Sequence, residues 1–285
     1  MSPPKTITVF THQYPGDTEE AVQRLIEAAA HNGVQLRFPP GEAEKHDIRG
    51  RPNCVVDVPV DGETDLAVVL GGDGTILTAL RSFAGRSAPV FAFNYGAIGF
   101  LSTVDHGELD RGLELALAGD YETIGMPALA VEWEGETHIG VNDISFQRRA
   151  SNRVARLEYC VAGEELGRVR CDGLVAATPV GSTGYNLANA GPVLAWGVEG
   201  FVVSFIAPHT LTARALVVAP QDPLTVKNLS EHEAVDVTTD GRPIGALGPG
   251  AALDVSFRED QVLLAQIPGS TFYHRFREKF GRLAH

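Results

Sequence analysis

Positive charge is scarce in this sequence. The chain has 23 lysine and arginine residues against 36 acidic residues, so its formal net charge is −13. This balance argues against nucleic acid and against an anionic membrane surface as partners. A phosphorylated ligand would therefore have to be bound by local groups, such as backbone amides, a helix N-terminus, a few arginines or a metal ion.

Cysteines and long apolar runs are also few. The three cysteines, Cys54, Cys160 and Cys171, form no C-x-x-C pair and are expected to be reduced thiols. No apolar stretch approaches the ~18 residues of a membrane-spanning helix, and the first ten residues lack the apolar segment of a secretion signal. The histidines show no metal-ligand spacing such as H-E-x-x-H, so no metal site built by side chains is expected. These absences predict a cytoplasmic protein with no membrane segment.

Strand-like and helix-like patterns alternate along residues 1–118. Residues 5–10 and 66–70 are β-branched runs typical of strands, whereas residues 18–33 repeat apolar residues at helical spacing. Residues 39–64 are polar and indicate a loop. The alternation predicts βαβ units and a parallel sheet.

After Gly119 the pattern changes. Short strand-like runs, one of them across residues 137–146, follow one another with turn residues between them, which is typical of an antiparallel β domain. Residues 269–285 return to helical spacing, and we expect this helix to pack back on the first domain. The sequence therefore predicts an α/β domain at 1–118, a β-rich domain at 119–268 and a C-terminal helix at 269–285.

The stretch GGDGT, residues 71–75, places three glycines around one carboxylate, between a strand expected to end at Leu70 and a helix expected to begin near Thr75. A loop after a buried parallel strand lies at the carboxyl end of the sheet, where open α/β sheets bind ligands. Glycines there let the backbone approach phosphate, and Asp73 can accept the proton of a hydroxyl that attacks phosphorus. The alternative is a tight turn, since Asp-Gly is a common turn dipeptide. A P-loop and a dinucleotide fingerprint are excluded, because no G-K-[ST] follows and Leu77 replaces the last glycine of G-x-G-x-x-G.

A second cluster, residues 171–193, combines a strand, a Pro-Val-Gly turn and a short helix. Ser182 and Thr183 can cap this helix, whose free amides would then offer a site for a polar or anionic group. Capping alone would explain the two hydroxyls, but it does not require Asp172 before the strand or Tyr185 beside the turn. A nucleophile elbow is excluded because Ser182 is not in G-x-S-x-G.

These motifs resemble those of the NAD kinases. GGDGT is weakly specific, since phosphofructokinases and lipid kinases share it. DGLVAATPVGSTGY at 172–185 is strongly specific and is similar to the family's D-G-[LV]-x-x-[ST]-T-P-T-G-S-T-A-Y. Further similar stretches are NYGAIGFL at 94–101, ND at 142–143, PHTLTARALVV at 208–218 and TTDG at 238–241. Their order along most of the chain argues against coincidence.

The resemblance implies a fold, an activity and partners. The fold would be a Rossmann-like, phosphofructokinase-like domain followed by an antiparallel β-rich domain. The activity would be transfer of a phosphate from ATP, or from polyphosphate, to the 2′-hydroxyl of the adenosine ribose of NAD. Mg²⁺ or another divalent cation would accompany the nucleotide. NAD and ATP are the implied partners, and the implied assembly is a homodimer or homotetramer.

The family's roles can be carried over onto matching positions. Asp73 would orient and deprotonate the attacking hydroxyl, while Asn142 and Asp143 would hydrogen-bond ribose hydroxyls. Asp172 would contact the nicotinamide half. The adenine would be held by Phe100, Thr183 and Tyr185. The other NAD contacts are implied at Gly74, Arg170 and Gly184, and the phosphate-donor loop at Gly71, Gly72, Gly74 and Thr75.

Some positions depart from the family pattern or have two interpretations. Val180 replaces the usual threonine and Gly184 the usual alanine, and neither change touches the implied chemistry. Arg170 favours NAD over NADH by the resemblance, with a solvated strand-edge arginine as the alternative. His209 would either contact phosphate or be a turn residue. Arg214 would either contact phosphate or pair with an acid.

Two other functions stay open from the sequence. The first is a lipid or sugar kinase that shares GGDGT, although it would not explain residues 172–185. The second is a sensor that binds NAD or NADP without catalysis. Asp73 discriminates between an enzyme and a sensor, because a sensor needs no base at that position.

Overall fold

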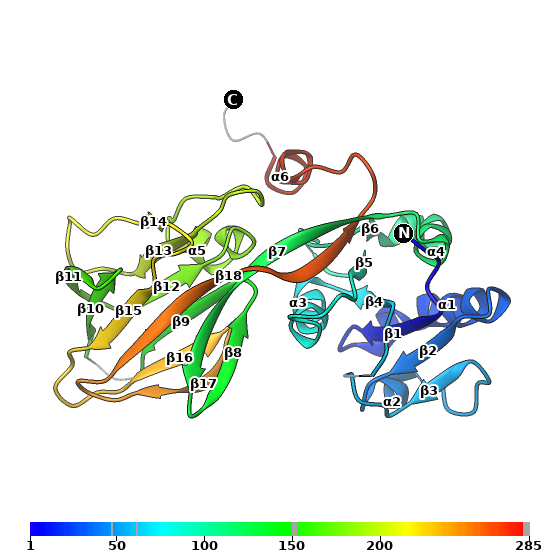
Figure 1. The fold of residues 1–285 in the computed structure, drawn as a ribbon, viewed down its shortest axis with the longest axis horizontal. Coiled ribbons are helices and arrows are strands. Elements are labelled where there is room, and N and C mark those ends of the chain that lie inside the picture. Colours follow the sequence, from blue (N-terminus) through cyan, green and yellow to red (C-terminus); the bar gives the residue numbers. More distant parts are fainter. Residues whose placement is uncertain (47, 61, 98, 150–152, 282–285) are drawn as a thin grey trace. The chain divides into compact units, whose positions relative to one another are not determined.

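The computed structural model of the chain describes residues 1–281 except 47, 61, 98 and 150–152 (Figure 1). The chain forms two compact units: Met1–Gly125 together with the chain from Val262 onward, and Met126–Gln261. Strands β7 (Glu122–Trp133) and β18 (Ala252–Gln266) each contribute residues to both units. None of the helices in the described residues combines the length and apolar character of a membrane-spanning segment.

The first unit, called the α/β unit below, alternates strands and helices. Its strands are β1 (Thr6–Thr11), β2 (Gln35–Phe38), β3 (Cys54–Val56), β4 (Leu66–Gly71), β5 (Val90–Asn94) and β6 (Val104–Asp105). Its α-helices are α1 (Glu19–His31), α2 (Glu42–His46), α3 (Asp73–Ser82), α4 (Leu109–Ala118) and α6 (Phe272–Phe280), and its 3₁₀ turns are η1 (Pro15–Asp17) and η2 (His106–Glu108).

The strands of the α/β unit form a parallel sheet in the order β3-β2-β1-β4-β5, with β6 beside β5. The chain moves outward from β1 in one direction through β2 and β3, and then in the other through β4 and β5. The carboxyl ends of β1 and β4 therefore flank a topological switch point, where open sheets of this kind bind ligands. β4 ends at Gly71, and only Gly72 separates it from Asp73, where α3 begins.

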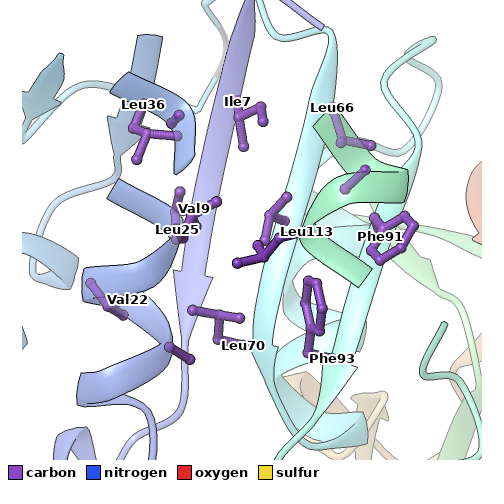
Figure 2. Close-up of a cluster of buried hydrophobic side chains, with 14 of the residues drawn as sticks. Ile7, Val9, Val22, Leu25, Leu36, Leu66, Leu70, Phe91, Phe93 and Leu113 are labelled. Atoms are coloured by element: carbon purple, nitrogen blue, oxygen red, sulfur yellow. The ribbon is translucent and has the colours of Figure 1, made fainter. Parts of the chain in front are cut away.

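The core of the α/β unit lies between the sheet and the helices α1 and α4 (Figure 2). β4 is buried along its whole length, as expected for a central parallel strand. Figure 2 shows Leu25 of α1 beside Val9 of β1, and Leu113 of α4 belongs to the same buried cluster as Leu70 and Phe93. These packed side chains hold the strand ends, and thus the loops that follow them, in fixed positions.

The second unit, called the β unit below, is built mainly of antiparallel strands. They are β8 (Glu136–Gly140), β9 (Asp143–Arg148), β10 (Ala155–Val161), β11 (Glu164–Cys171), β12 (Gly173–Ala177), β13 (Phe201–Ile206), β14 (Leu216–Val218), β15 (Leu224–Asn228), β16 (Val235–Thr239) and β17 (Arg242–Leu247), with η3 (Gly181–Thr183) and α5 (Tyr185–Ala188).

Two groups of strands share one core in the β unit. One sheet has the order β14-β13-β12-β9-β16-β17, and the other group contains β11-β10-β15-β18 and the pair β7-β8. Phe146 of β9 and Phe201 of β13 are buried in one cluster with Leu157 of β10 and Val255 of β18. The arrangement is a sandwich whose inner faces are apolar.

The predicted fold class is confirmed, including the parallel first sheet, the antiparallel second part and the C-terminal helix that packs on residues of the first. Three local expectations were wrong. Residues 39–64 are not all loop, because they contain α2 and β3. Helix α3 begins at Asp73 itself, so this residue lies in the first helical turn. The strand expected across Asn142 is interrupted there, between β8 and β9.

Candidate functional site

Asp73 is held by two backbone amides from another loop of the α/β unit. The amide of Phe100 donates to its Oδ2 at 3.2 Å and the amide of Leu101 donates to its Oδ1 at 3.1 Å. Each carboxylate oxygen thus accepts one hydrogen bond and keeps a further lone pair. The side chain is half-buried. Asp73 is therefore oriented by the protein and still able to accept a hydrogen bond from a ligand.

The glycines around Asp73 differ in how much space a side chain would have. A β-carbon on Gly72 would lie 3.2 Å from the Cα of Gly96, and a β-carbon on Gly96 would lie 2.8 Å from the Cα of Gly72. These two backbones therefore approach as closely as glycine allows. A β-carbon on Gly71 would lie 2.7 Å from the side chain of Thr75, but one on Gly74 would meet no atom within 4 Å. Packing explains Gly71 and Gly72, and it does not explain Gly74.

The loop that holds Asp73 is itself held by Asn94, at the end of β5. The Nδ2 of Asn94 donates to Asp105 at 3.1 Å, and its Oδ1 accepts from the amide of Gly96 at 3.0 Å. Gly99 has φ +65° and no room for a side chain, because Asn94 fills that space. The ring of Phe100, 4% exposed, packs against Phe272 and Phe280 of α6.

In the β unit, the carboxylate of Asp240 fixes the segment between β8 and β9. It accepts hydrogen bonds from the amides of Val141 at 3.0 Å, Asn142 at 2.7 Å and Asp143 at 3.0 Å. In return, the amide of Asp240 donates to the carbonyl of Asp143 at 2.9 Å. These bonds replace strand pairing at this point, which is the physical reason for the interruption of the expected strand.

The turn after β12 packs directly on Asn142. Thr178 donates from Oγ1 to the carbonyl of Val141 at 2.6 Å, and its amide donates to the carbonyl of Asn142 at 2.9 Å. A β-carbon on Gly181 would lie 1.9 Å from the Asn142 carbonyl oxygen, so only glycine fits. Within the described residues the Oδ1 of Asn142 is buried without a hydrogen-bond partner. An unsatisfied acceptor of this kind calls for an explanation, such as a ligand donor.

Asp143 lies in an environment that opposes ionisation. It is 6% exposed, and burial raises its pKa to about 7, with the negative charge of Asp240 adding to the effect. At neutral pH a large fraction of Asp143 is therefore protonated and can donate a hydrogen bond.

Residues 182–185 lie beside Asn142, but they do not cap a helix as expected. Ser182 donates from Oγ to Pro179 and accepts from the amide of Leu194, and Thr183 donates to the carbonyl of Val180. Neither η3 nor α5 has a side-chain cap, so that expectation was wrong. A β-carbon on Gly184 would lie 3.4 Å from the Gly181 carbonyl and 3.8 Å from Asn142, so the alanine usual in the family would fit.

Tyr185 and Asp172 also belong to this part of the β unit. The pKa of Tyr185 is raised by burial first, and then by the charges of Asp143 and Asp172. The carboxylate of Asp172 accepts from Nε of Arg148 at 2.6 Å. Asp172 is thus part of an ion pair, which the sequence did not indicate.

The remaining candidate residues lie at other places in the β unit. Arg170 and His209 adjoin, since the His209 amide donates to the Arg170 carbonyl at 2.7 Å, and both line a cavity of about 700 Å³. Arg214 donates to the carbonyls of Leu211 and Ala213 in its own loop. Its nearest partners are therefore backbone carbonyls and not the acid that the sequence offered as an alternative.

Sequence reasoning missed two residues that position others. Asp240 and Thr178 were quoted within motifs but received no role. The signal for Asp240 was present, because an Asp-Gly pair after a β-branched run indicates a turn whose carboxylate can accept backbone amides. Nothing in the sequence indicated which amides it would bind.

Among the described residues, no group of three His, Cys, Asp or Glu side chains is arranged to hold a metal ion.

The chain is similar to known proteins along most of its length. Residues 16–121 match the model of the ATP-NAD kinase N-terminal domain, and residues 141–264 match that of the ATP-NAD kinase C-terminal domain. A protein named NAD kinase from Symbiobacterium thermophilum is 34% identical over 268 residues, 92% of each chain. Another, from Geobacter sulfurreducens, is 35% identical over 281 residues, 96% of this chain and 98% of that one.

Solved structures share the fold. A yeast NADH kinase complexed with NADH superposes with a TM-score of 0.86 at 24% identity, covering 100% of this chain and 90% of that one. An NAD kinase from Archaeoglobus fulgidus in complex with ATP superposes with a TM-score of 0.73 at 24% identity, covering 97% of each chain. With both domain models matched and relatives above 30% identity over nearly the whole length, the chain belongs to the NAD kinase family.

Proposed function

We propose that this protein is an NAD kinase that transfers the γ-phosphate of ATP to the 2′-hydroxyl of the adenosine ribose of NAD, giving NADP. The observation that carries the proposal is Asp73, an acid oriented by two amides at the carboxyl end of a parallel sheet. Membership in the NAD kinase family supplies the substrate class. A non-catalytic sensor would not require an acid fixed in this way.

In this proposal Asp73 accepts the proton of the attacking hydroxyl. The O–H bond breaks as the oxygen forms its bond to the γ-phosphorus and the bond to the β-phosphate oxygen breaks, so that ADP leaves. The reaction needs positioning and charge neutralisation more than covalent help from the protein. The two amides of Phe100 and Leu101 keep the carboxylate in place while its remaining lone pairs face the hydroxyl.

The donor phosphates would be bound by the start of α3. The first amides of a helix have no partner within the helix and favour an anion. Gly72 permits close backbone approach, and Gly74 leaves open space where a side chain would stand. Mg²⁺ would accompany the donor on its phosphates, where it would neutralise their charge. Thr75 completes this proposed donor loop with Gly71.

NAD would be bound by residues that the family motifs mark. We propose that Asn142 and Asp143 hydrogen-bond ribose hydroxyls, a role that the unsatisfied Oδ1 of Asn142 and the protonated fraction of Asp143 support. Tyr185 would hold the adenine and Asp172 the nicotinamide half. Further proposed NAD contacts are Gly74, Phe100, Arg170, Thr183 and Gly184, and proposed phosphate contacts are His209 and Arg214.

The test is incubation of the purified protein with NAD, ATP and Mg²⁺, followed by an assay that detects NADP alone. We expect NADP to form in proportion to enzyme and time. Absence of NADP with correctly folded protein would contradict the proposed function. Replacing ATP by polyphosphate tests the second donor. Replacing NAD by NADH tests the preference for NAD proposed for Arg170, and equal rates with the two acceptors would contradict that preference.

We also propose a cytoplasmic homodimer or homotetramer. The edge strand β14 supports an assembly, because Leu216 and Val217 are exposed on it and Leu211 nearby is 92% exposed. The three cysteines are free, which agrees with a reducing compartment. Light scattering on a sizing column measures the mass, and a monomer at micromolar concentration would contradict the assembly.

A further inference from the structure

Helix α6 buries an arginine beside the loop that holds Asp73. Arg275 is 7% exposed. Its Nη1 donates to the carbonyls of Ser102 and Phe100, the latter at 3.4 Å, its Nη2 donates to Oε1 of Gln266, and its Nε donates to Oγ of Ser270 at 3.2 Å. Burial of a guanidinium costs free energy unless its donors are satisfied, and here carbonyl and side-chain oxygens satisfy them.

One of the carbonyls that Arg275 binds, that of Phe100, belongs to a peptide whose amide binds Asp73. The carbonyl of Phe100 and the amide of Leu101 are the two ends of a single peptide group. A trans peptide is planar and rigid, so its C=O and N–H point in opposite directions. The carbonyl faces Arg275 of α6, and the amide faces Asp73 at 3.1 Å. An arginine that fixes one end of this peptide necessarily fixes the other.

Other contacts of α6 make this helix a firm support. Phe276 stacks with Phe272, and Phe272 and Phe280 both contact the ring of Phe100. Lys279 lies 3.6 Å from Asp105, the same carboxylate that Asn94 binds. The helix is therefore attached at Phe100 and again at Asp105, and these contacts within the protein position Arg275.

We infer that Arg275 is a positioning residue for catalysis: it holds the Phe100–Leu101 peptide so that its amide keeps the Asp73 carboxylate in the orientation that accepts the hydroxyl proton. This inference rests on the role of Asp73 in the proposed function. Arg275 touches no substrate in this arrangement, and its effect on turnover passes through Asp73.

The test is a double-mutant cycle of Arg275→Met and Asp73→Asn, with Arg277→Met as the matched control. Arg277 is an exposed arginine on the same helix, so its replacement controls for the loss of charge and of helix propensity. We expect Arg275→Met to lower kcat about 10- to 100-fold, with the KM values for NAD and ATP within about threefold, because only orientation of the base is lost. Arg277→Met should retain wild-type kcat.

The decisive measurement is the kcat of the double variant. If Arg275 acts through Asp73, adding Arg275→Met to Asp73→Asn should change the residual kcat by less than about threefold. The inference would be overturned if the double variant lowered kcat by the product of the two single factors. A kcat of Arg275→Met equal to that of the control would also overturn it. Should Arg275→Met fail to fold in circular dichroism, Arg275→Lys replaces it in the same cycle, because an ammonium keeps the charge but not the planar set of donors.

The cycle separates this inference from the proposed function. Normal turnover of Asp73→Asn would refute the role of Asp73, and the inference about Arg275 with it. A slow Asp73→Asn together with multiplying effects would refute only the inference about Arg275.

Discussion

The two units hold their principal acids in opposite ways. In the α/β unit, both carboxylate oxygens of Asp73 accept backbone amides. In the β unit, Asp143 is buried, no hydrogen bond to its carboxylate occurs among the described residues, and its pKa rises to about 7. Amide donors suit a charged acceptor, whereas burial near a second acid suits a neutral donor.

One protein can thus use the same residue type for separate tasks. In the proposed function Asp73 accepts a proton, whereas Asp143 keeps one and donates a hydrogen bond to a ligand oxygen. Asp240, which binds three amides, supplies the negative charge that helps to keep Asp143 protonated. Environment, and not residue identity, separates the roles.

The largest effect is expected at Asp73. Asp73→Asn removes the proton acceptor but keeps the size of the side chain, so NAD affinity should stay within a few-fold. The rate should fall ~10²–10⁴-fold, on the order of 3–5 kcal/mol of barrier. Initial rates and calorimetric titration with NAD measure the two quantities. Turnover close to wild type would show that Asp73 is not the proton acceptor.

The next effect is the pH dependence of stability that Asp143 imposes. Its pKa of about 7 in the folded protein exceeds the ordinary value of 3.8, so the folded state binds this proton more tightly than the unfolded state. The stability that results is complete below pH ~4 and is lost as the pH rises to about 7, up to ~4 kcal/mol in total. Asp143→Asn should therefore be more stable than wild type at pH 8 by up to this amount, and the gain should vanish near pH 4.

Urea denaturation of both proteins from pH 4 to pH 8.5 measures this difference, read as the wild-type stability subtracted from that of the variant. The subtraction cancels groups that the two proteins share. A gain independent of pH would mean that Asp143 is ionised throughout, and the contrast between the two acids would be lost.

A smaller effect is expected at Asp240. Asp240→Ala leaves the amides of Val141, Asn142 and Asp143 without their acceptor, which should cost ~2–4 kcal/mol of stability and raise the KM for NAD. Asp240 has φ +45°, so part of any loss comes from alanine in this conformation. Asp260→Ala is the matched control, because Asp260 is exposed and has φ +46°. Equal losses in the two variants would show that the amide bonds contribute nothing.

The smallest effect is expected at Gly74. A β-carbon there meets no atom of the protein within 4 Å, and alanine favours a helix, so Gly74→Ala should fold at least as stably as wild type. If donor phosphates lie against this glycine, kcat/KM for ATP should fall about tenfold, ~1.4 kcal/mol. Gly197→Ala, at an exposed glycine with equally open surroundings, should leave the kinetics unchanged. Unaltered ATP kinetics in Gly74→Ala would place the phosphates elsewhere.

The sequence predicted the long elements of the α/β unit but not its short ones. Periodicity identified β4 and the parallel sheet, because a strand buried on both faces must be apolar throughout. It also placed Asp73 at the carboxyl edge. The short elements α2 and β3 escaped, because in polar segments tertiary contacts outweigh local propensity.

Partners distant in sequence could not be predicted. Asp240 binds amides about a hundred residues away, and Arg275 binds the carbonyl of Ser102 across a separation of 173 residues. The sequence implied a ligand contact for Asp172 but did not indicate its ion pair with Arg148, 24 residues earlier. A motif identifies the residues that it contains. The groups that orient those residues come from segments that are distant in sequence and adjacent only in the folded protein.

The most direct measurement is a crystal structure of the protein with NAD bound. The account predicts that the oxygen of the adenosine 2′-hydroxyl lies ~2.6–3.2 Å from a carboxylate oxygen of Asp73, with the amides of Phe100 and Leu101 still bound to that carboxylate. A 2′-hydroxyl beyond the reach of Asp73, even through one water molecule, would contradict it.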